Sequence, residues 1–342
     1  MKRIMLLCAA AAAVFTLGVP RADAADYRWR LYGALPTTHD YPKRLMEGLK
    51  RIEERSGGRL SIRYSYFAET PYKVTDALTV MRDGLAEMTE WLPSYSAGTY
   101  PVLAAPELPF LLPARTTSAE GQAAVNRAWA SPSVDAAMKR VLADHGAQLL
   151  GRYYFEPMNF WFVKPVKEIK EFQGRKVRVY SPELADLMTQ VGSSPVNLST
   201  TEVYTALQRN VLDGVITGAG NIRGSKWNEV LRSGYVTNVM FTSTSILVSR
   251  KALDKLPADL QTIVVEEMKA TTDALQTFMP QSDAAKQADL KTAGFAITEA
   301  SPEDYARFRE IASTGVWPAW SKRAGGESEK ILAEINNAIT GK

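Results

Sequence analysis

The sequence predicts an α/β fold with two hydrophobic cores. Segments with the period-2 alternation of β-strands and segments with helical spacing follow one another in a β-α-β-α order, which favours parallel sheets covered by helices. The chain has 342 residues, and one core commonly serves about 150 residues, so two cores are expected.

Strands and helices alternate through the first half of the chain. After a loop at 34–39, Leu45, Leu49 and Ile52 are spaced so that they share one helical face. The expected elements are a strand 27–33, this helix ending at Ser56-Gly57-Gly58, a strand 60–67, a helix 75–82, a strand 85–91 and helices over much of 118–143.

The apolar segment 148–163 is expected to form one long strand that is buried on both faces, because aromatic residues occupy consecutive positions in it. Such a strand suits a crossover between two parts of the molecule, and a second crossover is expected near 236–248. A helix 257–287, a strand 295–297 and terminal helices follow. Pro280 lies inside the longest helical pattern, where proline kinks or breaks a helix.

The segment from Gly174 to Gly214 is the most informative part of the chain. Lys176, Arg178 and Tyr180 alternate with valines, which predicts a strand with Arg178 near its carboxyl end. Ser181 and Pro182 then fit the N-cap and first position of a helix. The motif Ser199-Thr-Thr-Glu202 is a capping box that predicts a short helix through Asn210, and Asp213-Gly214 turns the chain into the next strand.

Arg178 is the main candidate for ligand contact. Ligands of open α/β sheets bind beyond the carboxyl ends of the strands, beside helix N-termini. A guanidinium at such a place can hold a carboxylate through two parallel hydrogen bonds. The alternatives are a solvated arginine on a strand and an arginine in a structural ion pair.

The N-terminus indicates secretion. Lys2 and Arg3 precede an apolar run that is shorter than the ~20 residues of a membrane-spanning helix, and Ala22-Asp23-Ala24 fits a signal-peptidase site. Residues 1–24 are therefore expected to be a cleaved signal peptide rather than a membrane anchor. Cleavage removes the one cysteine, Cys8, and lowers the formal charge from +4 to +2, too small for a nucleic-acid-binding surface.

Several short motifs occur together and in order. They are Ser56-Gly-Gly-Arg59, Met81-Arg-Asp-Gly84, Glu107-Leu-Pro-Phe-Leu111, Gly174-Arg-Lys-Val-Arg178-Val179, Glu202-Val-Tyr-Thr-Ala-Leu-Gln208, Val211-Leu-Asp213-Gly214 and Leu256-Pro-Ala-Asp-Leu260. With these motifs the chain resembles the substrate-binding subunit of tripartite ATP-independent periplasmic (TRAP) transporters, of the dicarboxylate-binding-protein-like family. The resemblance runs from about Tyr27 to about Gly294.

The resemblance implies a two-lobe periplasmic binding protein fold, in which each lobe is a central β-sheet flanked by helices and the ligand cleft lies between the lobes. Lobe I would comprise 25–155 plus about 244–283, and lobe II 156–243 plus about 284–342. It also implies a periplasmic protein that captures an organic acid by closing its lobes and delivers it to a small and a large membrane subunit, without catalysis and without stable membrane insertion.

In this family the arginine at the position of Arg178 is the principal anchor of the substrate carboxylate. Relatives for sialic acid or dicarboxylates often carry a second basic group on the preceding strand, but 156–161 contains none. A monocarboxylate with an apolar or aromatic body therefore fits better, with Met158 or Trp161 as the wall and Asn159 as a hydrogen-bonding group. Trp161 could equally be a core residue.

Other candidate contacts are spread over both expected lobes. Thr217 and Asn221 follow a strand and are expected in a loop. From the first lobe, the residues that should face Arg178 are Thr37, His39, Trp91 and Tyr95. Trp91 and Tyr95 could instead serve lobe packing.

The lack of an acidic residue near Thr217 argues against the metal-bridged binding mode of some relatives. Two histidines far apart exclude a multi-histidine metal site, and no cofactor is expected.

Two other functions compete with solute capture for TRAP subunits. A periplasmic hydrolase is disfavoured, because the chain has no G-x-S-x-G elbow, no S-x-x-K motif and no cysteine after residue 24. A binding protein for a different importer or for a sensor stays open from the sequence.

Overall fold

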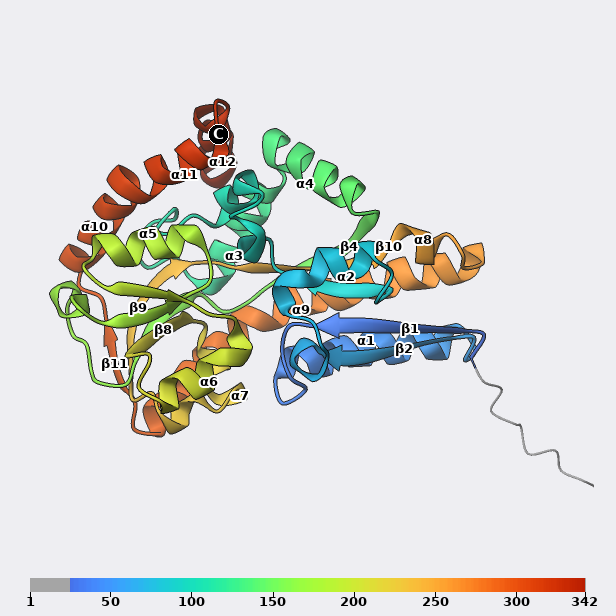
Figure 1. Ribbon diagram of the computed structural model, residues 1–342, viewed down its shortest axis with the longest axis horizontal. Coiled ribbons are helices and arrows are strands. Elements are labelled where there is room, and N and C mark those ends of the chain that lie inside the picture. The colour runs from blue at the N-terminus through green and yellow to red at the C-terminus, as the bar shows by residue number, and fades with distance from the viewer. Residues whose placement is uncertain (1–24, 342) are drawn as a thin grey trace, which may run out of the picture.

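The computed structural model describes residues 25–341, so the signal peptide expected at 1–24 lies outside the described residues. These residues form two mixed β-sheets with helices around them, and Figure 1 shows the first sheet on the right and the second on the left. The α/β fold class predicted from the sequence is confirmed, and the sheets position the cavity described below.

The first sheet has the strand order β2-β1-β3-β10-β4. β1 runs parallel to β2 and β3, whereas β10 is antiparallel to both of its neighbours. Its strands are β1 (Tyr27–Gly33), β2 (Leu60–Tyr66), β3 (Met88–Trp91), β4 (Ala147–Tyr154) and β10 (Ser243–Ser249).

The second sheet has the order β11-β9-β5-β8-β6-β7. β5 is antiparallel to β8 and β9, and the remaining pairs are parallel. Its strands are β5 (Met158–Phe162), β6 (Lys176–Val179), β7 (Ser194–Asn197), β8 (Gly214–Thr217), β9 (Ser233–Met240) and β11 (Ala296–Glu299).

Two expectations about the sheets were wrong. The segment 148–163 is not one strand: β4 ends at Tyr154, and β5 begins at Met158 in the other sheet. Pro157, which has no N–H to donate, lies in the break. The sheets are also mixed rather than parallel, because β5 and β10 are the strands that enter each sheet directly from the other one.

The chain passes directly between the sheets at two adjacent places, and a third time through the helical segment 250–292 between β10 and β11. It leaves the first sheet after β4 and returns from β9 to β10. Tyr154 pairs with Ser243 in the first sheet, and Met158 pairs with Met240 in the second. The N–H of Phe155 donates to the carbonyl of Thr242, 3.0 Å away, between those pairs. The two crossing segments therefore lie side by side and run in opposite directions.

The helices cover the faces of both sheets (Figure 1). They are α1 (Asp40–Arg55), α2 (Ala77–Arg82), α3 (Ser118–Trp129), α4 (Pro132–Asp144), α5 (Pro182–Gln190), α6 (Thr200–Gln208), α7 (Ala219–Gly224), α8 (Arg250–Leu253), α9 (Ala258–Thr292), α10 (Pro302–Ile311), α11 (Trp317–Ala324) and α12 (Ser328–Thr340). A 3₁₀ turn, η3 (Pro93–Ser96), follows β3.

The longest helix, α9, touches both halves of the molecule. It packs on α1 and β4 of the first sheet and on α7 beside the second. Pro280 lies within it, and the helix continues through the proline instead of breaking there.

The buried core is more continuous than the two separate cores that the sequence predicts. One buried cluster runs through both sheets, from Leu31 and Trp91 to Phe160 and Phe308. A smaller cluster lies on the other face of the second sheet, around Trp161, beneath α6 and α7. The larger cluster is continuous because the crossing segments are themselves buried and apolar.

Candidate functional site

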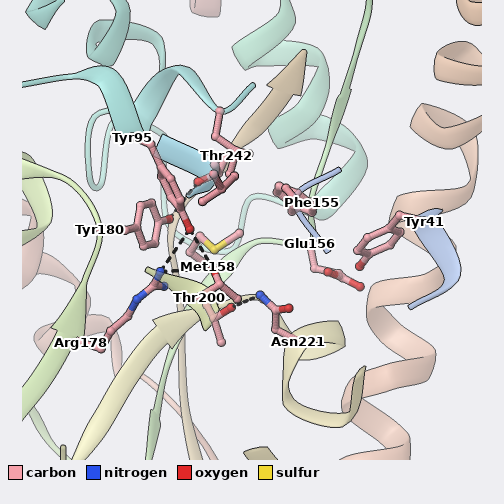
Figure 2. A pocket seen from close by; sticks show the side chains of 15 residues that line it. Tyr41, Tyr95, Phe155, Glu156, Met158, Arg178, Tyr180, Thr200, Asn221 and Thr242 are labelled. Carbon is pink, nitrogen blue, oxygen red and sulfur yellow. Dashed lines mark hydrogen bonds between the residues drawn. The ribbon is translucent and has the colours of Figure 1, made fainter. Parts of the chain in front are cut away.

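A cavity lies between the two sheets. Its walls come from η3 and the segment after β1 on one side, from the ends of β6 and β8 with the starts of α6 and α7 on the other, and from the crossing segments. Figure 2 shows its side chains. The lining residues are Ala34, Tyr41, Val74, Leu92, Tyr95, Phe155, Glu156, Met158, Arg178, Tyr180, Thr200, Thr217, Gly218, Asn221 and Thr242.

Arg178 lies at one end of this cavity, in β6, and is 1% exposed. Its Nε donates to the carbonyl of Leu198 at 2.9 Å, and Nη1 lies 3.5 Å from the carbonyl of Ile216. Its Nη2 donates to the hydroxyl of Tyr95 at 3.1 Å and to that of Thr200 at 3.4 Å. The backbone contacts fix the direction of the side chain, and the hydroxyl contacts mark the edge that faces the cavity.

The charge of Arg178 has no acidic partner within the described chain. Among the described residues, its guanidinium hydrogen bonds go to two backbone carbonyls and two hydroxyls, and none goes to a carboxylate. The ring centroid of Tyr180 lies 4.8 Å from the guanidinium carbon, a cation–π contact that compensates part of the charge. A buried charge is strongly unfavourable unless it is paired. The site is therefore suited to an anion.

Local sequence explains how the surroundings of Arg178 are built. The Ser181 hydroxyl accepts from the N–H of Leu184 and begins α5, as predicted. The capping box of Ser199 and Glu202 is also confirmed and begins α6 at Thr200, which places the Thr200 hydroxyl beside the guanidinium. The starts of two helices thus flank the end of β6, where their N–H groups favour negative charge.

The other end of the cavity is acidic. Glu156, in the first crossing segment, is 1% exposed, and its Oε1 accepts from Lys286 Nζ at 2.9 Å. The same ammonium lies 3.2 Å from the Tyr41 hydroxyl and 3.6 Å from Asp40 Oδ2. Burial, and then the neighbouring Glu156, raise the pKa of Tyr41 well above its ordinary value, so its hydroxyl stays protonated.

Between the two ends the wall is mostly apolar. Met158 and Phe155 form part of it, together with Leu92 and Val74. Asn221 adds a polar group: its Nδ2 donates to Thr217 Oγ1 at 2.9 Å, while its Oδ1 is buried without a hydrogen-bond partner.

The structure gathers five of the sequence-derived candidates in the cavity wall, namely Arg178, Tyr95, Met158, Thr217 and Asn221. Thr217 is the last residue of β8, and Asn221 lies in α7 rather than in the expected loop.

Three other candidates lie away from the cavity wall. Trp91 is buried, and its indole N–H donates to Ser96 at 2.9 Å. Trp161 belongs to the smaller core cluster on the opposite face of the second sheet. Asn159 is fully buried, and its Oδ1 accepts from the N–H groups of Thr237 and Asn238, where the pairing of β5 with β9 shifts register.

Thr37 and His39 lie outside the inner cavity. Thr37 is exposed. His39 lines a separate groove formed by the start of α1, the end of α7 and the middle of α9. Its Nε2 lies 3.2 Å from the Ser225 hydroxyl, across the gap between the two halves. Burial, and secondarily the charge of Lys286, lower the pKa of His39 to about 4, so its imidazole is neutral at pH 7.

Sequence reasoning missed Tyr41, Tyr180, Thr200, Glu156 and Lys286 as members of the site. Thr200 stands in the capping box and Tyr180 two residues after Arg178, so local position was an available signal for both. Tyr41 and Lys286 are far apart in the chain, and no local pattern connects them.

Within residues 25–341, no group of three or more His, Cys, Asp or Glu side chains is placed to hold a metal ion. In the same range, no helix combines the length and apolar character needed to cross a bilayer.

Comparisons with known proteins agree with this geometry. The model of a family described as "Bacterial extracellular solute-binding protein, family 7" matches residues 36–322. A protein described as a solute-binding protein, from Albidiferax ferrireducens, is 25% identical over 333 residues, covering 95% of this chain and 94% of its own length.

Solved structures show the same fold. The Bordetella pertussis extracytoplasmic solute receptor DctP6, solved with pyroglutamic acid, has a TM-score of 0.81 at 22% identity, covering 91% of this chain and 99% of that chain. A TRAP periplasmic solute-binding protein from Desulfovibrio salexigens with bound orotic acid has a TM-score of 0.80 at 21% identity, covering 92% and 99%.

Proposed function

This chain belongs to family 7 of the bacterial extracellular solute-binding proteins, and we propose that it captures an organic acid in the periplasm and delivers it to TRAP-type membrane subunits. Solute binding, rather than catalysis, is the activity that describes this family. The single observation that carries the proposal is the buried guanidinium of Arg178, which has no acidic partner among the described residues and faces a cavity.

The ligand carboxylate would bind at Arg178, with the hydroxyls of Tyr95 and Thr200 as further hydrogen-bond partners. A hydrogen bond to a charged group contributes ~1.5–3 kcal/mol net. Thr217 and Asn221 would contact the ligand from the side of the second sheet. Trp91, Trp161, Asn159, Thr37 and His39 are not part of this proposed set, because they do not line the cavity.

The proposed ligand is a monocarboxylate whose body packs against Met158, Phe155 and Leu92. The cavity wall holds one arginine and no second basic side chain. Structures of related fold contain the acids pyroglutamic acid and orotic acid. Because those two proteins are 22% and 21% identical to this chain, their acids serve here as test compounds.

A thermal-shift screen tests the proposal. The panel should contain monocarboxylates, dicarboxylates, neutral sugars and amines. A ligand at about 100 times its Kd adds ~2.7 kcal/mol to stability, so a bound carboxylate should raise the melting temperature clearly. Stabilisation confined to sugars or amines, or by no carboxylate at all, would overturn the proposal. Genes for one small and one large membrane subunit beside this gene would support the transport partner.

A further inference from the structure

The cavity carries opposite charges at its two ends. Arg178 provides a buried cation at one end, and Glu156 a buried carboxylate at the other; Figure 2 shows them on opposite sides of Met158. The proposed function assigns the ligand carboxylate to Arg178. It leaves the acidic end without a role.

One oxygen of Glu156 is available for a hydrogen bond. Lys286 occupies Oε1, and no described residue donates a hydrogen bond to Oε2. A Cβ atom placed on Gly218 would lie 3.0 Å from Oε2, and Gly218 lines the cavity. Oε2 therefore lies at the cavity wall. A donor group on a bound ligand would find an acceptor here.

A second acceptor nearby is also without a partner. The Oδ1 atom of Asn221 is buried and accepts no hydrogen bond, while the amide nitrogen of the same side chain is held by Thr217. Figure 2 shows the amide oxygen turned toward the side of Glu156 and Tyr41. Unpaired buried polar atoms are rare in folded proteins and call for an explanation. Asn221 Oδ1 thus needs a donor, and it lies on the same side of the cavity as Glu156.

A second acid group on the ligand would be unfavourable here. Lys286 is the nearby cation, and it faces two carboxylates, Glu156 at 2.9 Å and Asp40 at 3.6 Å. Asp40 also lies 3.7 Å from Lys43, so the negative charge that faces the cavity is the carboxylate of Glu156, which is the acidic residue in the described lining. A ligand carboxylate placed beside Glu156 would meet like charge.

We infer that the solute is a monocarboxylate that carries an N–H or O–H donor away from its carboxylate, and that Glu156, with Asn221, selects for this donor. The inference rests on the proposed function, because it uses Arg178 to fix the orientation of the ligand. It narrows the ligand class to acids with a polar far end, and it excludes dicarboxylates.

Matched ligand pairs test the inference by calorimetry. 6-Hydroxyhexanoate is compared with 6-fluorohexanoate, in which a fluorine replaces the terminal O–H donor. The second pair is 4-hydroxybenzoate and 4-fluorobenzoate, which differ by an O–H donor on an aromatic body. The donor-bearing member of a pair that binds is expected to bind at least tenfold more tightly.

Variants then assign the preference to Glu156. Glu156→Gln keeps an oxygen for Lys286 and replaces the other carboxylate oxygen by a donor, so the affinity ratio within a pair should fall at least tenfold. Asp40→Asn removes the other carboxylate beside Lys286, outside the cavity wall, and should leave that ratio unchanged. Melting temperatures of both variants check that they fold.

The outcomes separate this inference from the proposed function. Binding of carboxylates with no preference for donors, a preference for dicarboxylates, or an unchanged ratio in a folded Glu156→Gln variant would overturn the inference alone. If the carboxylates bound in the screen all lack an N–H or O–H donor, the inference is also wrong. Failure of every carboxylate to bind would overturn the proposed function and the inference with it.

Discussion

The Nη2 atom of Arg178 lies 3.1 Å from the hydroxyl of Tyr95, although the two residues belong to different halves of the molecule. Arg178 is in β6 of the second sheet, whereas Tyr95 is in the turn η3 that follows β3 of the first sheet. The same hydroxyl lies 3.0 Å from that of Thr200. The proposed carboxylate anchor is thus also a contact between the halves, which couples ligand binding to closure.

Arg178→Ala should weaken binding of a carboxylate found in the screen by roughly tenfold or more. The variant removes charged hydrogen bonds of ~1.5–3 kcal/mol, and ~1.4 kcal/mol corresponds to one decade in Kd. Calorimetry measures the change. Arg209→Ala, at an exposed arginine after α6, is the control and should bind normally. Equal affinity of the Arg178 variant and the unmodified protein would refute the anchor.

Tyr95→Phe should weaken binding by up to about tenfold, because it removes a hydroxyl that reaches both Arg178 and Thr200. A hydrogen bond to a charged group contributes ~1.5–3 kcal/mol net, and the bond that the same hydroxyl makes with Arg178 in the absence of ligand offsets part of the loss. Tyr72→Phe is the control, since the Tyr72 ring stacks on Tyr32 away from Arg178. Calorimetric affinities that are the same for both variants would contradict the proposed contact.

Gly224→Ala should hinder closure. A Cβ atom on Gly224 would lie 2.3 Å from the His39 ring, which belongs to the other half of the molecule. The added methyl would also disturb the bond from the Thr38 hydroxyl to the Gly224 carbonyl. We expect weaker ligand binding and a larger radius of gyration by X-ray scattering with ligand present. Gly326→Ala, where a Cβ meets nothing within 4 Å, should behave like the unmodified protein.

Glu107→Gln should change how stability depends on pH. Burial raises the pKa of Glu107 to about 7, above its ordinary value of 4.5, although the hydroxyl and N–H of Ser243 partly oppose this. The folded chain therefore binds a proton that the unfolded chain has lost between about pH 4.5 and 7. The stabilisation linked to this proton is complete below that range and is lost as pH rises through 7.

The side chain of the Glu107→Gln variant does not titrate, so the variant does not lose this stabilisation as the pH rises. Relative to the unmodified protein, its free energy of unfolding should increase by on the order of 1–3 kcal/mol between pH 5 and pH 8. Urea unfolding at both pH values measures the difference. A constant difference at the two pH values would show that Glu107 does not titrate as described.

Pro280→Ala should alter the rate of closure, because α9 packs on both halves and Pro280 interrupts its hydrogen-bond ladder. Stopped-flow fluorescence of the seven tryptophans, with a carboxylate from the screen, measures the rate. Thr277→Ala, an exposed position one turn earlier, should leave it unchanged. Unchanged rates for the proline variant would rule out a role in closure.

Local patterns predicted the parts of the site that are local in the chain. The alternation around Arg178 located its strand, and Ser181 and Ser199 were correctly identified as helix starts. These signals work because caps and strand periods depend on neighbours within a few residues. The same signals could not tell which face of β5 meets the cavity, so Trp161 was grouped with Met158.

Contacts between distant segments could not be predicted in this way. Lys286 and Tyr41 meet Glu156 only because α9 returns along α1 and reaches the first crossing segment. The division of 148–163 into two strands was also missed, because a continuous apolar run shows no boundary by periodicity. Pro157 was the available signal of the break.

We expect the adjacent crossing segments at 154–158 and 240–243 to act as the pivot about which one half swings. Displacement on opening grows with the distance from a pivot, so contacts near it, such as that between Tyr180 and Thr242, should persist in the open form. Contacts at the rim, such as that between His39 and Ser225, should separate first. Access for the solute would therefore begin at the rim, and the wall near Thr242 would stay assembled in the empty protein.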